Sequence, residues 1–145
     1  MATFCDPRDA AVAVYDIAPI ERQVGSARSF SRVRSMKDAI DLISDNLWNL
    51  QTWLDEPAVL QISFRELSQS PMISCSRIAQ HIGIAVDSAK IMAQFQSGAR
   101  PIKEFNKGTA GRYKFIMNED DLQYCQESFG DMMDRIARLS NPRAG

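Results

Sequence analysis

The chain has 145 residues, of which 45% are hydrophobic and 24% are charged, and its formal net charge is -1. A chain of this size supports one hydrophobic core, and its near-neutral charge excludes a global attraction to nucleic acid or to an anionic membrane. Cys5, Cys75 and Cys125 match neither a disulfide framework nor a zinc motif, and no apolar stretch is long enough to span a bilayer. We therefore expect a cytoplasmic protein that holds no metal.

The first element follows a short apolar stub at residues 1–4. Asp6 is suited to cap a helix and Pro7 to open it, so the sequence predicts a short helix that continues through Tyr15. Residues 16–35 contain Pro19, Gly25 and several serines and arginines without a sustained apolar period. We expect a flexible connection over residues 16–35.

A long amphipathic helix is predicted next. Ser35 and Asp38 have the spacing of a capping pair, and Pro57 marks the end of the helix. Its apolar face comprises Met36, Ala39, Ile40, Ile43, Leu47, Leu50 and Leu54. Trp48 and Trp53 are interpreted as packing residues on the same helix.

The apolar run over residues 58–64 has the length of a strand that is buried on both faces. Two shorter helices are expected at residues 74–82 and 87–96, with Gly83 ending the first. A basic loop that contains glycines covers residues 98–114. The last helix is expected to begin at Asn118, and its buried stripe comprises Leu122, Cys125, Phe129, Met132, Met133, Ile136 and Leu139.

Four segments, in order along the chain, resemble the sulfotransferase family that uses 3'-phosphoadenylyl sulfate. They read CDPRDAAVAVY at residues 5–15, VLQISFREL at 59–67, RIAQHIGI at 77–84 and FNKGTAGRYK at 105–114. The resemblance implies an α/β fold, here a truncated P-loop-type sulfotransferase fold that is mostly helical with a remnant parallel sheet. Residues 1–145 would then form a single partial domain, the carboxy-terminal portion of the family fold.

The resemblance also assigns donor-binding positions. Cys5 and Ala13 stand where family members have an arginine and a serine that hold the 3'-phosphate, and Phe64 stands where many have a tyrosine near the adenosine. In the last segment Asn106 replaces the leading arginine of the family loop. The remaining residues of that loop match the pattern or occupy its variable acidic or basic position: Lys107, Gly108, Gly111 and Arg112.

The family's phosphate loop and its usual catalytic histidine both precede the first matching segment, and no stretch of this sequence supplies either. His81 is in the wrong place to act as the base and is interpreted as structural. We therefore expect weak or absent binding of 3'-phosphoadenylyl sulfate and no complete sulfuryl transfer by this chain alone. The alternative is a non-catalytic binding or interaction module derived from the same fold.

Simpler interpretations stay open for each segment. The basic loop is either an anion site, because its glycines allow close approach to a phosphate, or an ordinary solvated loop. The residues at the start of the first segment also suffice to begin a helix without any ligand. The basic stretch 26–37 either contacts an acceptor or is ordinary flexible surface. A strand built for burial with no flanking strands favours self-association or a completing partner chain.

Overall fold

Helices dominate the computed structural model, which describes residues 1–25, 29–85, 87, 89–91, 93 and 109–140. The only sheet among these residues is a parallel pair of strands, so the expected mostly helical architecture with a small parallel sheet is confirmed. The elements are β1 (Ala2–Phe4), α1 (Pro7–Gln23), the 3-10 helix η1 (Ser29–Arg32), α2 (Met36–Asp55), β2 (Gln61–Ser63), α3 (Phe64–Gln69), α4 (Pro71–Ile82), α6 (Tyr113–Ile116) and α7 (Glu119–Ser140).

Helix α1 begins as the sequence predicts but is longer. The carboxylate of Asp6 accepts a hydrogen bond from the backbone N–H of Arg8 at 3.0 Å, and Pro7 occupies the first helical position. The helix then continues to Gln23 although Pro19 lies inside it. The prediction of an irregular connection is therefore wrong for residues 16–23, because burial of Ala18 against the core outweighs the local cost of the proline.

Helix α2 matches its prediction at both ends. The backbone N–H of Asp38 donates to Ser35 Oγ at 3.1 Å, while the N–H of Ser35 donates to the Asp38 carboxylate at 3.0 Å. This second bond helps to hold the pKa of Asp38 below its usual value, after a larger contribution from the N–H of Arg34. The tryptophan prediction is wrong, because Trp48 is 74% exposed and Trp53 is 57% exposed.

Strands β1 and β2 pair in parallel, with Ala2 opposite Gln61 and Phe4 opposite Ser63. The second strand is shorter than predicted because Ser63 caps a new helix, α3, by accepting a hydrogen bond from the N–H of Glu66 at 3.0 Å. Phe64 therefore lies in the first turn of α3 and not at the end of a strand.

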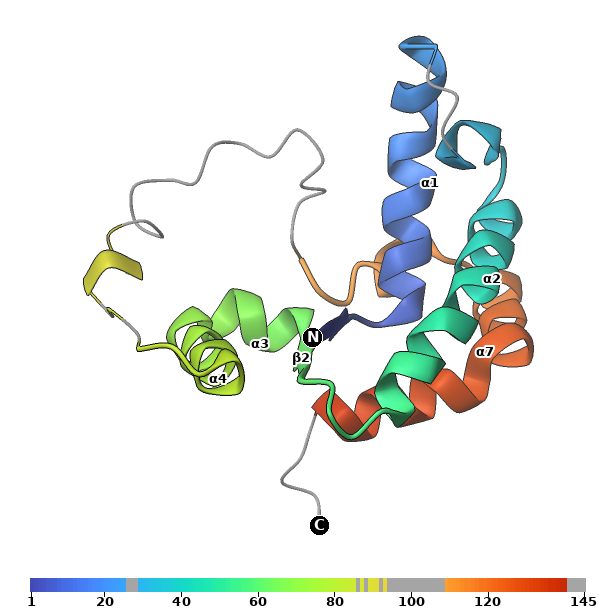
Figure 1. The fold of residues 1–145 in the computed structure, drawn as a ribbon. Coiled ribbons are helices and arrows are strands. Elements are labelled where there is room, and N and C mark those ends of the chain that lie inside the picture. The colour runs from blue at the N-terminus through green and yellow to red at the C-terminus, as the bar shows by residue number, and fades with distance from the viewer. Residues whose placement is uncertain (26–28, 86, 88, 92, 94–108, 141–145) are drawn as a thin grey trace.

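Helices α1, α2 and α7 gather on one side of the strand pair, and α3 and α4 lie on the other (Figure 1). The three long helices share most of the core, in which Val12 and Ile40 are fully buried. At the start of α7, Asn118 and Asp121 exchange hydrogen bonds between side chain and backbone. Phe129 interrupts this helix with a non-helical backbone conformation that the sequence did not predict.

Helix α4 ends at Gly83, whose φ of 74° is in the left-handed region, as the sequence predicts. It is tied to the sheet by Arg77, which bonds both carboxylate oxygens of Glu66 at 2.6 Å and the carbonyl oxygen of Gln61 at 3.0 Å. Half of the residues predicted to form a helix at 87–96 lie outside the described residues, and the described residues 89–91 and 93 are helical. In the part of the chain that is described, the helices are too short or too polar to cross a bilayer.

Candidate functional site

A cavity of about 680 Å³ lies where the start of α1, the start of α3, the segment of residues 109–114 and the second half of α7 meet. This segment turns at residues 110–112 and enters α6 at Tyr113, and it is called the turn at residues 109–114 below. Five of the residues that the resemblance assigns to the donor site line this cavity: Cys5, Ala13, Phe64, Gly111 and Arg112. The other three, Asn106, Lys107 and Gly108, lie outside the described residues. Segments separated by about fifty residues in the sequence therefore converge on one cavity.

The turn at residues 109–114 is held against α1 by Asp9. One carboxylate oxygen of Asp9 accepts a hydrogen bond from the N–H of Gly111 at 2.6 Å, and the other accepts from the N–H of Tyr113 at 3.1 Å. Gly111 has a φ of 81°, which a residue with a side chain rarely adopts. The glycine is required by this backbone conformation and not by crowding, because an added Cβ would meet no atom within 4 Å.

Arg8 forms a second contact with the turn. Its guanidinium donates to both oxygens of Asp6, at 2.9 and 2.6 Å, and lies over the ring of Tyr113 at 3.9 Å from the centroid. The hydrogen bond to Asp6 raises the pKa of Arg8, so the side chain stays charged. An ion pair between Arg112 and Asp16 adds a third contact, which lies closer to the carboxyl end of α1.

The cationic side chains around the cavity differ in how far they are already paired. Arg8 and Arg112 are bonded to carboxylates of α1 or of its cap. Arg65 donates to the amide oxygen of Gln69 at 3.2 Å, and Lys114 is exposed with its Nζ 6.0 Å from the centroid of the Tyr113 ring. Lys114 and Arg65 are therefore the lining cations best able to bind an external anion.

Cys5 and Ala13 contribute little to anion binding. Although Cys5 is exposed by surface area, desolvation by the surrounding protein raises the pKa of its thiol to about 11, and the charges of Asp9 and Asp6 add to the shift. The thiol is therefore protonated at neutral pH and carries no charge. The side chain of Ala13 ends in a methyl group, which donates no hydrogen bond.

Sequence reasoning missed several parts of this site. Asp9 has a sufficient local explanation at the start of a helix, whereas its hydrogen-bond partners lie 102 and 104 residues away. Met133 and Ile136 of α7 belong to or pack against the core, as the sequence predicts, but their position beside this cavity was not predicted. Arg65 follows the run 58–64 that was predicted as a strand, yet it lies in α3, and the Ser63–Glu66 spacing, which is that of a capping box, could have indicated a helix there.

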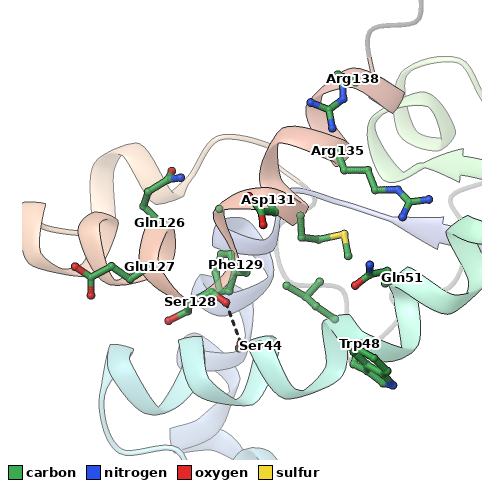
Figure 2. Close-up of a pocket in the computed structure, with 13 residues that line it drawn as sticks. Ser44, Trp48, Gln51, Gln126, Glu127, Ser128, Phe129, Asp131, Arg135 and Arg138 are labelled. Carbon is green, nitrogen blue, oxygen red and sulfur yellow. Dashed lines mark hydrogen bonds between the residues drawn. The ribbon is translucent and has the colours of Figure 1, made fainter.

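A second cavity, of about 510 Å³, lies between α2 and α7 beside the interruption at Phe129 (Figure 2). The hydroxyl of Ser44 donates to the carbonyl oxygen of Ser128 at 3.4 Å, and Trp48 borders the opening. None of the assigned residues that the structure describes lines it. We therefore take the first cavity as the candidate site.

Among the described residues, no three side chains of histidine, cysteine, aspartate or glutamate gather as metal ligands. Comparisons of the chain with protein-family models, with curated proteins and with solved structures find no match.

Proposed function

We propose that this chain is a sulfotransferase-like unit that takes the adenosine bisphosphate part of 3'-phosphoadenylyl sulfate in the first cavity and does not complete sulfuryl transfer alone. The observation that carries the proposal is the convergence of three segments. The start of α1, the start of α3 and the turn at residues 109–114 line one cavity, and they are the segments in which the resemblance assigns donor-binding positions.

The lining residues fit such a nucleotide in part. Phe64 and Met133, which are half-buried, offer apolar surface for an adenine ring, and Lys114 and Arg65 offer positive charge for phosphate. Two positions do not fit, because the neutral thiol of Cys5 and the methyl group of Ala13 supply no strong donor. Weak binding is the consequence that we expect.

Transfer requires more than nucleotide binding, because a transferring group must be held and its acceptor deprotonated. The only histidine of the sequence, His81, is an exposed residue in the last turn of α4 and does not line the cavity. Cys5 and Arg8, which line the cavity, cannot act as a base there, because desolvation raises the pKa of the Cys5 thiol to about 11 and the hydrogen bond to Asp6 raises the pKa of Arg8. We therefore expect no turnover from the isolated chain.

Calorimetric titration with adenosine 3',5'-bisphosphate tests the binding. We expect a weak but measurable affinity that falls roughly tenfold in Lys114→Ala and in Arg65→Ala, since each removes a charged contact. Lys37→Ala, which removes the same charge on α2 outside the cavity, is the matched control and should bind like the unmodified chain. No binding, or equal losses in all three variants, would contradict the nucleotide proposal.

A radiolabelled-donor assay tests the absence of transfer. Purified chain should transfer no sulfate to any acceptor. Turnover that survives further purification and is lost in Lys107→Ala would refute this part of the proposal.

The interaction-module alternative is favoured by the edges of the sheet. The outer carbonyl of Gln61 on β2 is bonded by Arg77, whereas no described strand pairs with the outer edge of β1. An open edge of this kind can pair with a second copy or with another chain. Light scattering over a wide concentration range should then detect association, and a strictly monomeric species would count against this alternative.

A further inference from the structure

The amide groups of the turn at residues 109–114 already have an anionic partner within the chain. We infer that Asp9 is a positioning residue, which fixes this turn, and that an incoming phosphate is bound by side chains and not by the N–H groups of Gly111 and Tyr113. The statement about phosphate rests on the proposed nucleotide site. The statement about the turn does not.

The turn binds the carboxylate of Asp9 as it would bind an external anion. Its two carboxylate oxygens accept separate N–H groups, at 2.6 and 3.1 Å, from residues on either side of Arg112. The left-handed conformation of Gly111 reverses the chain at this point. Backbone N–H groups presented in such a turn are typical binding partners of phosphates, and here a carboxylate occupies that position.

The other contacts show how the turn lies along α1. Asp9 and Asp16 are seven residues apart, so both lie on one face of the helix, two turns from each other. Asp9 holds the backbone of the turn, and Asp16 holds the guanidinium of Arg112. Arg8 stacks on Tyr113 from the first of these turns. The segment is thus fixed along one face of α1 by its backbone and by two side chains.

This arrangement limits how a phosphate can approach. At the N–H groups of Gly111 and Tyr113 it would meet the negative charge of Asp9, and bringing like charges together opposes binding. Lys114, which follows Tyr113 directly, is exposed and lines the same cavity. We therefore assign phosphate contact to Lys114, at a position that Asp9 sets through its hydrogen bonds to the backbone of Gly111 and Tyr113, three residues and one residue earlier.

Amide hydrogen exchange measured by NMR tests the positioning role without any ligand. Asp9→Asn keeps the size of the side chain but leaves one acceptor oxygen for two N–H groups. We expect the Gly111 and Tyr113 amides to exchange roughly ten to a hundred times faster in this variant, since charge-assisted hydrogen bonds are lost. Asp45→Asn, which removes the same charge from an exposed site on α2, should leave both rates unchanged.

Unchanged exchange in Asp9→Asn would overturn the inference whatever the chain binds. Should that variant not fold, Asp9→Glu retains the charge and displaces the carboxylate by one methylene. It should then raise the exchange of the same two amides by a smaller factor, and unchanged rates would again overturn the inference.

Titration with adenosine 3',5'-bisphosphate tests the assignment of the phosphate contact. Affinity should fall at least about tenfold in Asp9→Asn, because Lys114 is no longer fixed in place. Tighter binding in Asp9→Asn would overturn the assignment, since it would mean that the carboxylate blocks the amides from the phosphate. If the unmodified chain binds no nucleotide at all, the proposed function fails, and the exchange rates still decide the role of Asp9.

Discussion

Restoring the phosphate contacts that the resemblance assigns should strengthen the proposed binding of a nucleotide to this chain. The double variant Cys5→Arg with Ala13→Ser places a guanidinium and a hydroxyl on the wall of the cavity that holds Phe64 and the turn at residues 109–114. Each charged or polar contact is worth roughly 1–3 kcal/mol when its geometry is right. Two such contacts would in principle tighten binding by about 2–6 kcal/mol.

The structure reduces this expectation. The carboxylates of Asp9 and Asp6 lie close enough to Cys5 to raise the pKa of its thiol. The same negative charges would attract a guanidinium at position 5 and compete with the phosphate for it. We therefore predict a gain of roughly ten- to a hundredfold in affinity, which corresponds to about 1.4–2.8 kcal/mol.

Calorimetric titration of the unmodified chain and the double variant with adenosine 3',5'-bisphosphate measures this gain. Cys5→Gln with Ala13→Ser is the matched control, because it adds a polar side chain without the charge. Adding Asn106→Arg extends the test to the leading position of the loop, which lies outside the described residues. Equal and undetectable binding by folded forms of all these proteins would refute the reasoning and favour the interaction-module alternative.

Three further predictions concern stability and reactivity. Ile40→Ala, at a fully buried position, should lower the free energy of unfolding by about 2–5 kcal/mol in denaturant titrations, and a loss below 1 kcal/mol would mean that α2 is not packed as described. Gly130→Ala should change stability by less than about 1 kcal/mol in thermal melts, because the gain in helix propensity is offset by displacement of the exposed Gln126 side chain, whose Nε2 lies 2.2 Å from the added Cβ. The raised pKa of Cys5, about 11 against an ordinary 9.0, should slow its alkylation at pH 8 about a hundredfold relative to a free thiol, with the rate rising towards pH 11. Peptide-resolved mass spectrometry measures this rate, and fast alkylation at pH 8 would contradict the shift.

Local signals predicted the starts of α1, α2 and α7 well, whereas α3 was not predicted and α4 begins at Pro71, three residues before its predicted start. The caps at Asp6, Ser35 and Asn118 depend on residues within a few positions of one another, so the sequence contains all the information that they need. The left-handed end of α4 at Gly83 is equally local. These features could be predicted because no distant contact decides them.

Features that depend on tertiary packing were predicted poorly. Helix α1 continues through Pro19 because other residues of the helix, such as Ala18, are buried in the core. The strand predicted at residues 58–64 ends at Ser63 because α3 begins at Phe64. Trp48 has the residue type of a packing residue, yet it borders an open cavity where α7 is interrupted at Phe129. Neither the interruption nor the exposure has a signal within a short window of sequence.

The candidate site likewise contains residues that could be predicted from the sequence and one, Asp9, that could not. The resemblance brought together Cys5, Phe64 and Gly111, and the structure places these residues on one cavity. The role of Asp9 could not be predicted, because an acid near the start of a helix is explained locally by the helix dipole. Its hydrogen bonds to Gly111 and Tyr113 join residues that are 102 and 104 positions apart, so they depend on the tertiary fold.

The bond from Gly111 to Asp9 spans 102 residues, which has a consequence for the order of folding. Closing so long a loop costs more chain entropy than forming the local turns of α2 or α7, so we expect the helices to form early and the cavity to be among the last parts to assemble. A nucleotide added during refolding should then bind only in the slowest kinetic phase. Its binding signal would report completion of the native topology, whereas far-ultraviolet circular dichroism would report the earlier helices.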